Sequence, residues 1–300
     1  MLPRRNLSNM NRRTFMQTLP VGVAVASGAL SNGHAVANQE VAAKPSVGRG
    51  SGFRHSVCQW CYSSMDLADL TKQAKAMGIE SIELLSEDQW KIVQANGLMC
   101  AVANGPTTIS SGFNRIENHD AIVKRAEELL PKIKAAGIPN MIVFSGNRAG
   151  LSDADGLKNC AIGLKRITPL AESLGVTVIM ELLNSKIDHK DYQCDHTAWG
   201  AELVKRTESD RFRLLYDIYH MQVQEGDVIH TISDNQWAIA HYHTGGVPGR
   251  AEIDQSQELQ YPAICRALKD MGYRDFLAQE FIPQRDPMKS LAEAVRICTV

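Results

Sequence analysis

The sequence lacks the features of a nucleic-acid-binding or nucleotide-binding protein. Its 32 lysines and arginines are matched by 33 acidic residues, so a net charge of −1 leaves no basic surface for nucleic acid. No G-x-G-x-x-G turn follows an early strand, which argues against a doubly wound sheet that binds a nucleotide cofactor. The composition, 44% hydrophobic and 22% charged, is that of an ordinary globular protein.

The seven cysteines do not form a disulfide framework, because they are odd in number and widely scattered. Cys58 and Cys61 make one C-x-x-C spacing, but no second such pair and no suitably spaced histidine pair completes a zinc site. The pair also lacks the thioredoxin-like setting of a redox motif. We expect both thiols to pack in the core, with a disulfide formed after export or a redox or metal role as the alternatives.

Residues 1–37 predict a cleavable export signal. They hold four arginines and no acid, then a mildly apolar stretch rich in small residues at 18–31 and an A-x-A exit at 35–37. The motif NRRTFMQ at 11–17 is similar to the twin-arginine export motif, with a plain secretory signal as the alternative. The apolar stretch is too short and too weak to span a membrane.

Twin-arginine export carries folded proteins, often with a cofactor already loaded. We therefore expect a periplasmic or cell-envelope protein that holds a cofactor and does not insert stably into the membrane. A flexible linker over residues 38–52 would join the signal to a mature domain at 53–300. The sequence does not fix the oligomeric state, and a homo-oligomer is compatible with it.

From residue 53 onward, short apolar runs alternate with amphipathic stretches. Several runs are continuously apolar, as strands buried on both faces are. The runs predict eight strands, at 53–62, 81–86, 99–105, 140–146, 177–184, 212–220, 238–246 and 276–283. The clearest helical patterns between them lie at 65–78, 119–137, 155–175 and 261–272.

Eight strand-then-helix units in about 250 residues predict a single α/β domain with the (β/α)8 TIM-barrel fold. A doubly wound sheet is the alternative, and it would need the glycine-rich turn that is missing. Two of the predicted helices contain a proline, Pro131 or Pro169, so we expect each of them to kink or break.

Polar side chains close the last four predicted strands, where the chemistry of such a barrel is located. One potential metal ligand stands at each of these four ends: Glu181, Asp217, His243 and Glu280. Consecutive strand ends are neighbours around the rim, so we expect the four groups to converge. Three acids at close range repel one another unless a cation lies among them.

The ligand set of oxygen and nitrogen atoms predicts one divalent metal ion: Mn²⁺, Mg²⁺, Co²⁺ or Zn²⁺. The absence of a thiolate argues against a structural zinc site. A cation would also explain Asp217, since it offsets the desolvation of an acid at the end of an apolar strand. His241, taken alone, is expected to be an ordinary core histidine.

Four segments carry a family resemblance: MELLN (180–184), YDIYHMQ (216–222) with EGD after it, AHYHTGGVPGRAEI (240–253) and QEFIP (279–283). Through them the mature chain resembles the xylose isomerase-like TIM barrels and, within them, the hydroxypyruvate isomerases. His243 stands where those isomerases would have glutamine, and there it matches the ketose 3-epimerases.

The resemblance implies a divalent metal held by Glu181, Asp217, His243 and Glu280. The two glutamates would also be the catalytic residues that move the proton. His220 and Arg250 would contact substrate oxygens. Further substrate-contact candidates, from their positions past strands five and one, are Lys186, His189 and Trp60.

The expected reaction is isomerisation of a small α-hydroxycarbonyl compound, a keto-sugar or hydroxy-keto acid, through a metal-stabilised enediolate. Return of the proton to the opposite face would instead make the protein a ketose 3-epimerase. Loss of a β-substituent would make it a lyase or hydratase on oxidised sugars in the envelope. A non-catalytic sugar-binding barrel is the further alternative.

Overall fold

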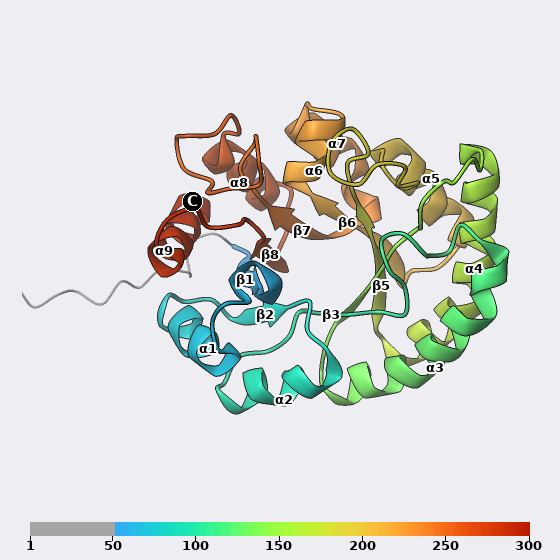
Figure 1. The fold of residues 1–300 in the computed structure, drawn as a ribbon, viewed down its shortest axis with the longest axis horizontal. Coiled ribbons are helices and arrows are strands. Elements are labelled where there is room, and N and C mark those ends of the chain that lie inside the picture. Colours follow the sequence, from blue (N-terminus) through green and yellow to red (C-terminus); the bar gives the residue numbers. More distant parts are fainter. Residues whose placement is uncertain (1–51) are drawn as a thin grey trace, which may run out of the picture. The chain divides into compact units, whose positions relative to one another are not determined.

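The computed structural model describes residues 52–300, which form a barrel of eight parallel strands surrounded by helices (Figure 1). The hydrogen-bonded order is β2-β1-β8-β7-β6-β5-β4-β3, and single bridges at Ser81–Met99 and Leu85–Ala103 join β2 to β3. The strands are β1 (Arg54–Cys58), β2 (Ser81–Glu83), β3 (Val102–Ala103), β4 (Asn140–Val143), β5 (Thr177–Leu182), β6 (Phe212–Asp217), β7 (Ile239–Thr244) and β8 (Phe276–Gln279).

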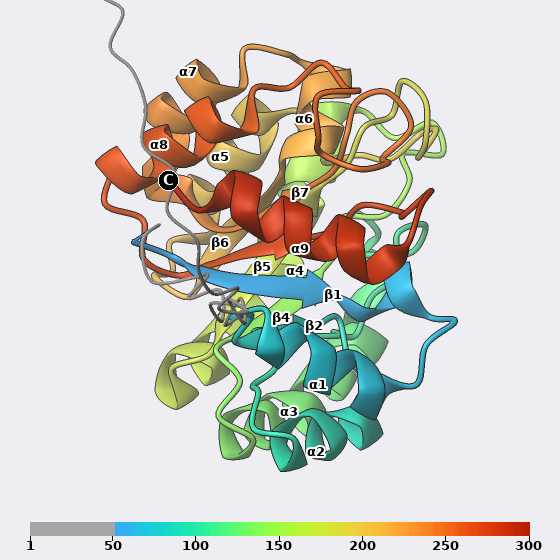
Figure 2. The ribbon, with the colours of Figure 1, turned by 90° about the vertical axis from the view of Figure 1, so that its left-hand side faces the viewer.

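Helices cover the outside of this barrel and separate successive strands. They are α1 (Leu67–Ala76), α2 (Glu87–Ala95), α3 (His119–Ala135), α4 (Asp153–Leu174), α5 (Thr197–Thr207), α6 (Ile218–Gln224), α7 (Val228–Asn235), α8 (Tyr261–Asp270) and α9 (Pro287–Cys298). The last of them, α9, packs against β8 and lies across the first strand in Figure 2. Side-chain caps start several helices: the Asp66 carboxylate accepts hydrogen bonds from two amides of the first turn of α1.

The predicted TIM barrel is confirmed, and all eight predicted strands and the four predicted helices are present. The doubly wound alternative is wrong, because the sheet curves round until β2 meets β3. The predicted helix breaks are also wrong, since α3 and α4 run through Pro131 and Pro169. Both prolines lie on exposed faces, where water can hydrate the carbonyl that loses its amide partner, and the buried faces hold the helices together.

Two apolar clusters follow from the alternation of side chains along the strands. The larger lies between strands and helices, while a small one fills the barrel: Ala101, Val102, Ile142, Ile179, Leu215 and Phe276. Two residues beyond Ile179 and Leu215, on the same inward-facing side, come Glu181 and Asp217. The barrel interior therefore changes from apolar to acidic toward the carboxyl ends of the strands.

The predicted export signal (1–37) and residues 38–51 of the predicted linker lie outside the described residues. In the part of the chain that the structure does describe, no helix has the length and apolarity needed to cross a bilayer. All seven cysteines are free thiols, so Cys58 and Cys61 do not form a disulfide here. Cys58 is fully buried, whereas Cys61 is partly exposed.

Candidate active site

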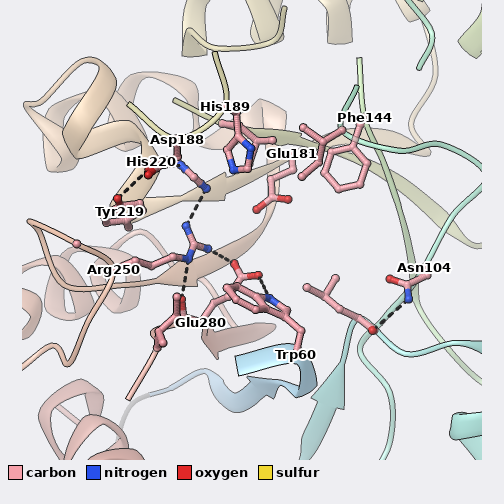
Figure 3. A pocket seen from close by; sticks show the side chains of 15 residues that line it. Trp60, Asn104, Phe144, Glu181, Asp188, His189, Tyr219, His220, Arg250 and Glu280 are labelled. Atoms are coloured by element: carbon pink, nitrogen blue, oxygen red, sulfur yellow. Dashed lines mark hydrogen bonds and ion pairs between the residues drawn. The ribbon is translucent and has the colours of Figure 1, made fainter. Parts of the chain in front are cut away.

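A cavity of about 590 Å³ opens at the carboxyl ends of the strands (Figure 3). Its charged and polar lining includes Glu181, Asp188, His189, His220, Arg250 and Glu280. Its apolar lining includes Trp60, Leu84, Ile109, Phe144, Leu183 and Ile282. The site predicted from the strand ends therefore lies at the mouth of the barrel.

The structure brings the four predicted metal ligands together. One ligand atom from each of Glu181, Asp217, His243 and Glu280 lies within 4.8 Å of the other three. Glu181 and His243 belong to β5 and β7, Asp217 ends β6, and Glu280 directly follows β8. All four side chains are buried, which places three carboxylates in a small, poorly hydrated volume.

Arg250 supplies positive charge to this group from the loop that follows β7. Its Nη2 donates to Oδ2 of Asp217 at 2.5 Å and also to Oε2 of Glu280, while its Nε donates to the Glu280 carbonyl at 3.0 Å. The backbone of Arg250 has a positive φ of 55°, a conformation that residues other than glycine seldom adopt. The guanidinium thus forms ion pairs with two of the four side chains that could hold a cation.

The surroundings separate the pKa values of the three acids. Burial, reinforced by the charge of Glu280, raises the pKa of Glu181. Burial also raises the pKa of Asp217 to about 7 against the attraction of Arg250. Burial is outweighed at Glu280, where His243 and Arg250 hold the pKa well below its ordinary value. Glu280 is therefore a fixed anion, and Glu181 is the better proton acceptor near neutral pH.

Glu83, at the end of β2, also belongs to this site and was not predicted from the sequence. Its fully buried carboxylate accepts hydrogen bonds from Ser56 Oγ at 2.6 Å, His241 Nε2 at 2.7 Å and His243 Nε2 at 2.8 Å. Burial would raise the pKa of Glu83, but His241 and His243 outweigh it and lower the pKa to about 2. The signal was an acid inside the apolar run SIELLS, the same signal that pointed to Asp217.

Glu83 fixes the orientation of the His243 ring. With Nε2 donating to Glu83, Nδ1 faces the other carboxylates, 2.5 Å from Glu280 Oε2 and 3.6 Å from Glu181 Oε1. A carboxylate that holds the far nitrogen of a histidine is the usual support of a histidine ligand to a metal. His241 is a core histidine as expected, buried with its Nε2 on the same carboxylate.

The tautomer of His220 follows from Asn184. The Asn184 Oδ1 accepts the backbone N–H groups of Ile187 and Asp188, so its Nδ2 donates to His220 Nδ1 at 2.7 Å. Burial, together with the charge of Arg250, keeps the pKa of His220 well below its ordinary value. The ring is therefore neutral, with its proton on Nε2 at the cavity.

The contact between Arg250 and the Nε2 proton of His220 is unfavourable. Its Nη1 lies 2.7 Å from Nε2 of His220, so two N–H groups face each other across a hydrogen-bonding distance. The ion pairs with Asp217 and Glu280 hold the guanidinium in place in spite of this contact.

The other predicted substrate contacts differ in position. Trp60 lines the cavity from the turn after β1, and its indole Nε1 donates to Glu280 Oε1 at 2.6 Å. Lys186 is not among the residues that line the cavity, and its Nζ donates to the Gln224 carbonyl at 2.5 Å. The loop turns back toward α6 just after β5, and His189, the other candidate of this loop, lines the cavity.

An ion pair between a buried acid and a partly exposed arginine anchors that loop. The Asp195 carboxylate accepts from Arg148 Nη2 at 2.9 Å, from Ser185 Oγ at 2.5 Å and from His196 Nδ1 at 2.7 Å. Burial would raise the pKa of Asp195, but these hydrogen bonds outweigh it and hold the pKa below its ordinary value. The segment that presents Asp188 and His189 to the cavity is thus fixed at its far end.

Comparison with known proteins agrees with this geometry. The sequence matches the protein family described as "Xylose isomerase-like TIM barrel" over residues 69–298. The chain belongs to this family. It is 25% identical over 250 residues to a putative hydroxypyruvate isomerase of Homo sapiens, which covers 78% of this chain and 90% of the human protein.

One further relative and one solved structure agree with this placement. A 2-oxo-tetronate isomerase of Cupriavidus necator is 30% identical over 141 residues, which are 45% of this chain and 54% of that enzyme. The crystal structure of an AP endonuclease, family 2, from Brucella melitensis superposes with a TM-score of 0.73 at 21% identity. That superposition covers 80% of this chain and 98% of the Brucella protein, and it reflects the shared fold.

Replacing Glu83 with glutamine is expected to lower the free energy of unfolding by about 3 kcal/mol, because it removes one partner of a buried network of charged groups. Urea denaturation of the metal-free protein measures this. The matched control is Glu202→Gln on the exposed side of α5, where the ion pair with Arg206 is hydrated and the change should have little effect. Equal stability of the two variants would contradict the role given to Glu83.

Replacing Asp195 with asparagine should destabilise the protein by about 2 kcal/mol at pH 7. Because the pKa of Asp195 is lowered in the fold, its contribution is present above about pH 4 and is lost as the pH falls below that value. Urea denaturation at pH 7 and pH 3 checks the sign. Asp153→Asn is the control, since Asp153 binds the same Arg148 from the surface. A difference that grows toward pH 3 would refute the assignment.

Proposed function

We propose that this chain is a divalent-metal-dependent isomerase of the sugar isomerase and epimerase kind, similar in chemistry to hydroxypyruvate isomerases. The observation that carries the proposal is the convergence of four ligand atoms, from the ends of four successive strands, within 4.8 Å of one another. Relatives named as isomerases of hydroxypyruvate and 2-oxo-tetronate support the reaction class. The substrate is a small keto-sugar or hydroxy-keto acid.

The residues present fit a divalent cation. Three carboxylates and one imidazole make a ligand set suited to Mn²⁺, Mg²⁺, Co²⁺ or Zn²⁺, and Arg250 alone does not balance the three acids. Glu181, Asp217, His243 and Glu280 would hold the ion, with Glu83 keeping His243 Nδ1 turned toward it. Such an ion, when bound, polarises the substrate carbonyl and stabilises the negative charge that develops there.

Glu181 is the proposed proton acceptor. Its carboxylate points into the cavity (Figure 3), where it can take a proton from the carbon next to a carbonyl. Return of that proton to the neighbouring carbon, together with transfer of the hydroxyl proton to the former carbonyl oxygen, completes an isomerisation. Glu181 itself can return the proton, and Glu280, the second glutamate of the site, can do so only after its ion pair with Arg250 is broken.

His220 and Arg250 are the proposed substrate contacts. The neutral His220 presents its Nε2 proton to the cavity, where it can donate to a substrate oxygen. A cation among the four ligands would replace Arg250 as counter-ion to Asp217 and Glu280. The guanidinium would then leave its unfavourable contact with His220 and bind a carboxylate or two hydroxyls of the substrate.

Ketose 3-epimerisation is the second candidate function, and the observation that favours it is an imidazole, His243, at the strand-seven position. The same proton removal serves both reactions, and they differ in where the proton returns. Elimination from an oxidised sugar and binding without catalysis are the other outcomes that the test separates.

We also propose that the leader at 1–37 exports the chain by the twin-arginine route to the periplasm or cell envelope.

The reaction is tested by incubating the protein with hydroxypyruvate and a panel of keto-sugars in deuterated water containing Mn²⁺. Deuterium at a carbon next to the carbonyl is expected, and the product then identifies the reaction: an isomer, an epimer or a product of lower mass. No exchange with any member of the panel would overturn the catalytic proposal and leave a sugar-binding barrel.

The metal site is tested with Asp217→Ala. This variant should bind Mn²⁺ at least about 100-fold more weakly and lose proton exchange, because one ligand is gone, while its far-ultraviolet circular dichroism stays unchanged. The control is Asp210→Ala, an exposed acid just before the other end of the same strand, which should keep both properties. A metal-replete, active Asp217→Ala protein would contradict the ligand assignment.

A further inference from the structure

The cavity is divided into two chemically different halves. The ends of β5 to β8 and their loops supply the charged half, which contains Glu181, His220, Arg250 and Glu280. The segments after β2, β3 and β4 supply an apolar wall, defined here as Leu84, Ile109 and Phe144, which Trp60 and Ile282 extend. Figure 3 shows Phe144 on the opposite side of Glu181 from Arg250 and Tyr219.

The cavity is much larger than the smallest substrate of this chemistry. Hydroxypyruvate has about seven non-hydrogen atoms, and at roughly 30 Å³ each, the volume of a liquid water, they fill only about 210 Å³. The cavity measures about 590 Å³. With the α-hydroxycarbonyl group at Glu181 and Glu280, most of the remaining space faces the apolar wall.

The apolar wall is held in place by the backbone. Leu84 has a positive φ of 60°, and two hydrogen bonds fix this unusual conformation. The Leu84 amide donates to the Val102 carbonyl at 2.9 Å, and Asn104 Nδ2 donates to the Leu84 carbonyl at 3.2 Å. Phe144 packs on the barrel's interior cluster, and its amide donates to Thr107 Oγ1 at 2.8 Å. The surface is thus built before any ligand arrives.

Packing within the protein accounts for only part of this wall. Leu84 and Phe144 cover the interior cluster, but Trp60 and Ile282 are 41% and 40% exposed and belong to no such layer. The indole of Trp60 is nonetheless fixed by its hydrogen bond to Glu280. Exposed apolar side chains that continue a buried wall beside a charged site are typical of a ligand subsite.

We propose that the apolar wall is a subsite for an aryl or alkyl substituent of the substrate. The natural substrate is then a keto-sugar or hydroxy-keto acid that carries such a group, rather than hydroxypyruvate or an unsubstituted triose. This inference rests on the proposed function, because it takes the reacting group to lie at Glu181 and Glu280.

The test compares two α-hydroxyketones that differ in one substituent, 2-hydroxyacetophenone with a phenyl group and hydroxyacetone with a methyl group. Both have exchangeable protons on the carbinol carbon, so the Mn²⁺-loaded enzyme is assayed for deuterium incorporation from deuterated water. The KM for 2-hydroxyacetophenone should be at least about tenfold lower, since the ring is buried against the wall. Equal KM values would overturn the proposal.

Two variants separate the subsite from general effects on the enzyme. Ile109→Ser and Ile282→Ser change partly exposed wall residues, so folding should be preserved; each should raise the KM for the phenyl compound at least about fivefold and that for hydroxyacetone less than twofold. Ile229→Ser, on the exposed face of α7 and outside the cavity, is the control and should change neither. A parallel rise of both KM values in the wall variants would refute the subsite.

Failure of the reaction itself can be told apart from failure of the subsite. If neither ketone exchanges deuterium, the proposed function is wrong, and binding of 2-hydroxyacetophenone is then measured by calorimetry. A Kd weakened at least about fivefold by Ile109→Ser and not by Ile229→Ser would still establish the subsite. Equal Kd values for the two variants would contradict the subsite.

Discussion

Three carboxylates and an imidazole buried within a few ångströms of one another are the constraint on which this molecule is built. Such a group is stable only if positive charge lies among the acids, because burial of unpaired carboxylates costs several kcal/mol each. In the structure the charge comes from Arg250, which pairs with Asp217 and Glu280, and from His243, which lies between Glu280 and Glu83. The same charges could be balanced by one divalent cation.

The barrel explains how these groups meet. Inward-facing positions recur every second residue, so the apolar interior formed by Ile179 and Leu215 is followed directly by Glu181 and Asp217. Because parallel strands share one direction, every such change occurs at the same end of the barrel. The charged half of the cavity and its apolar wall then follow from which strands end in acids and which lead into apolar loops.

Much of this could be predicted from the sequence, because strands buried on both faces appear as apolar runs and an acid at the end of such a run is conspicuous. Glu83 is also an acid at the end of an apolar run, but it ends β2, whereas the predicted ligands all lie at the ends of β5 to β8. The position of Lys186 could not be predicted, since the path of its loop depends on distant contacts such as Arg148 with Asp195. Pro131 and Pro169 do not break α3 and α4, because packing of the buried helix faces outweighs the local effect of a proline.

We propose that Arg250 holds the place of a metal ion. A crystal structure of the protein soaked in Mn²⁺, with anomalous scattering recorded at the manganese edge, should then show one peak among Glu181, Asp217, His243 and Glu280. The Arg250 guanidinium should have moved off Asp217 and Glu280 toward the cavity. An absent peak, with Arg250 still paired to both acids, would show that no metal ion belongs there.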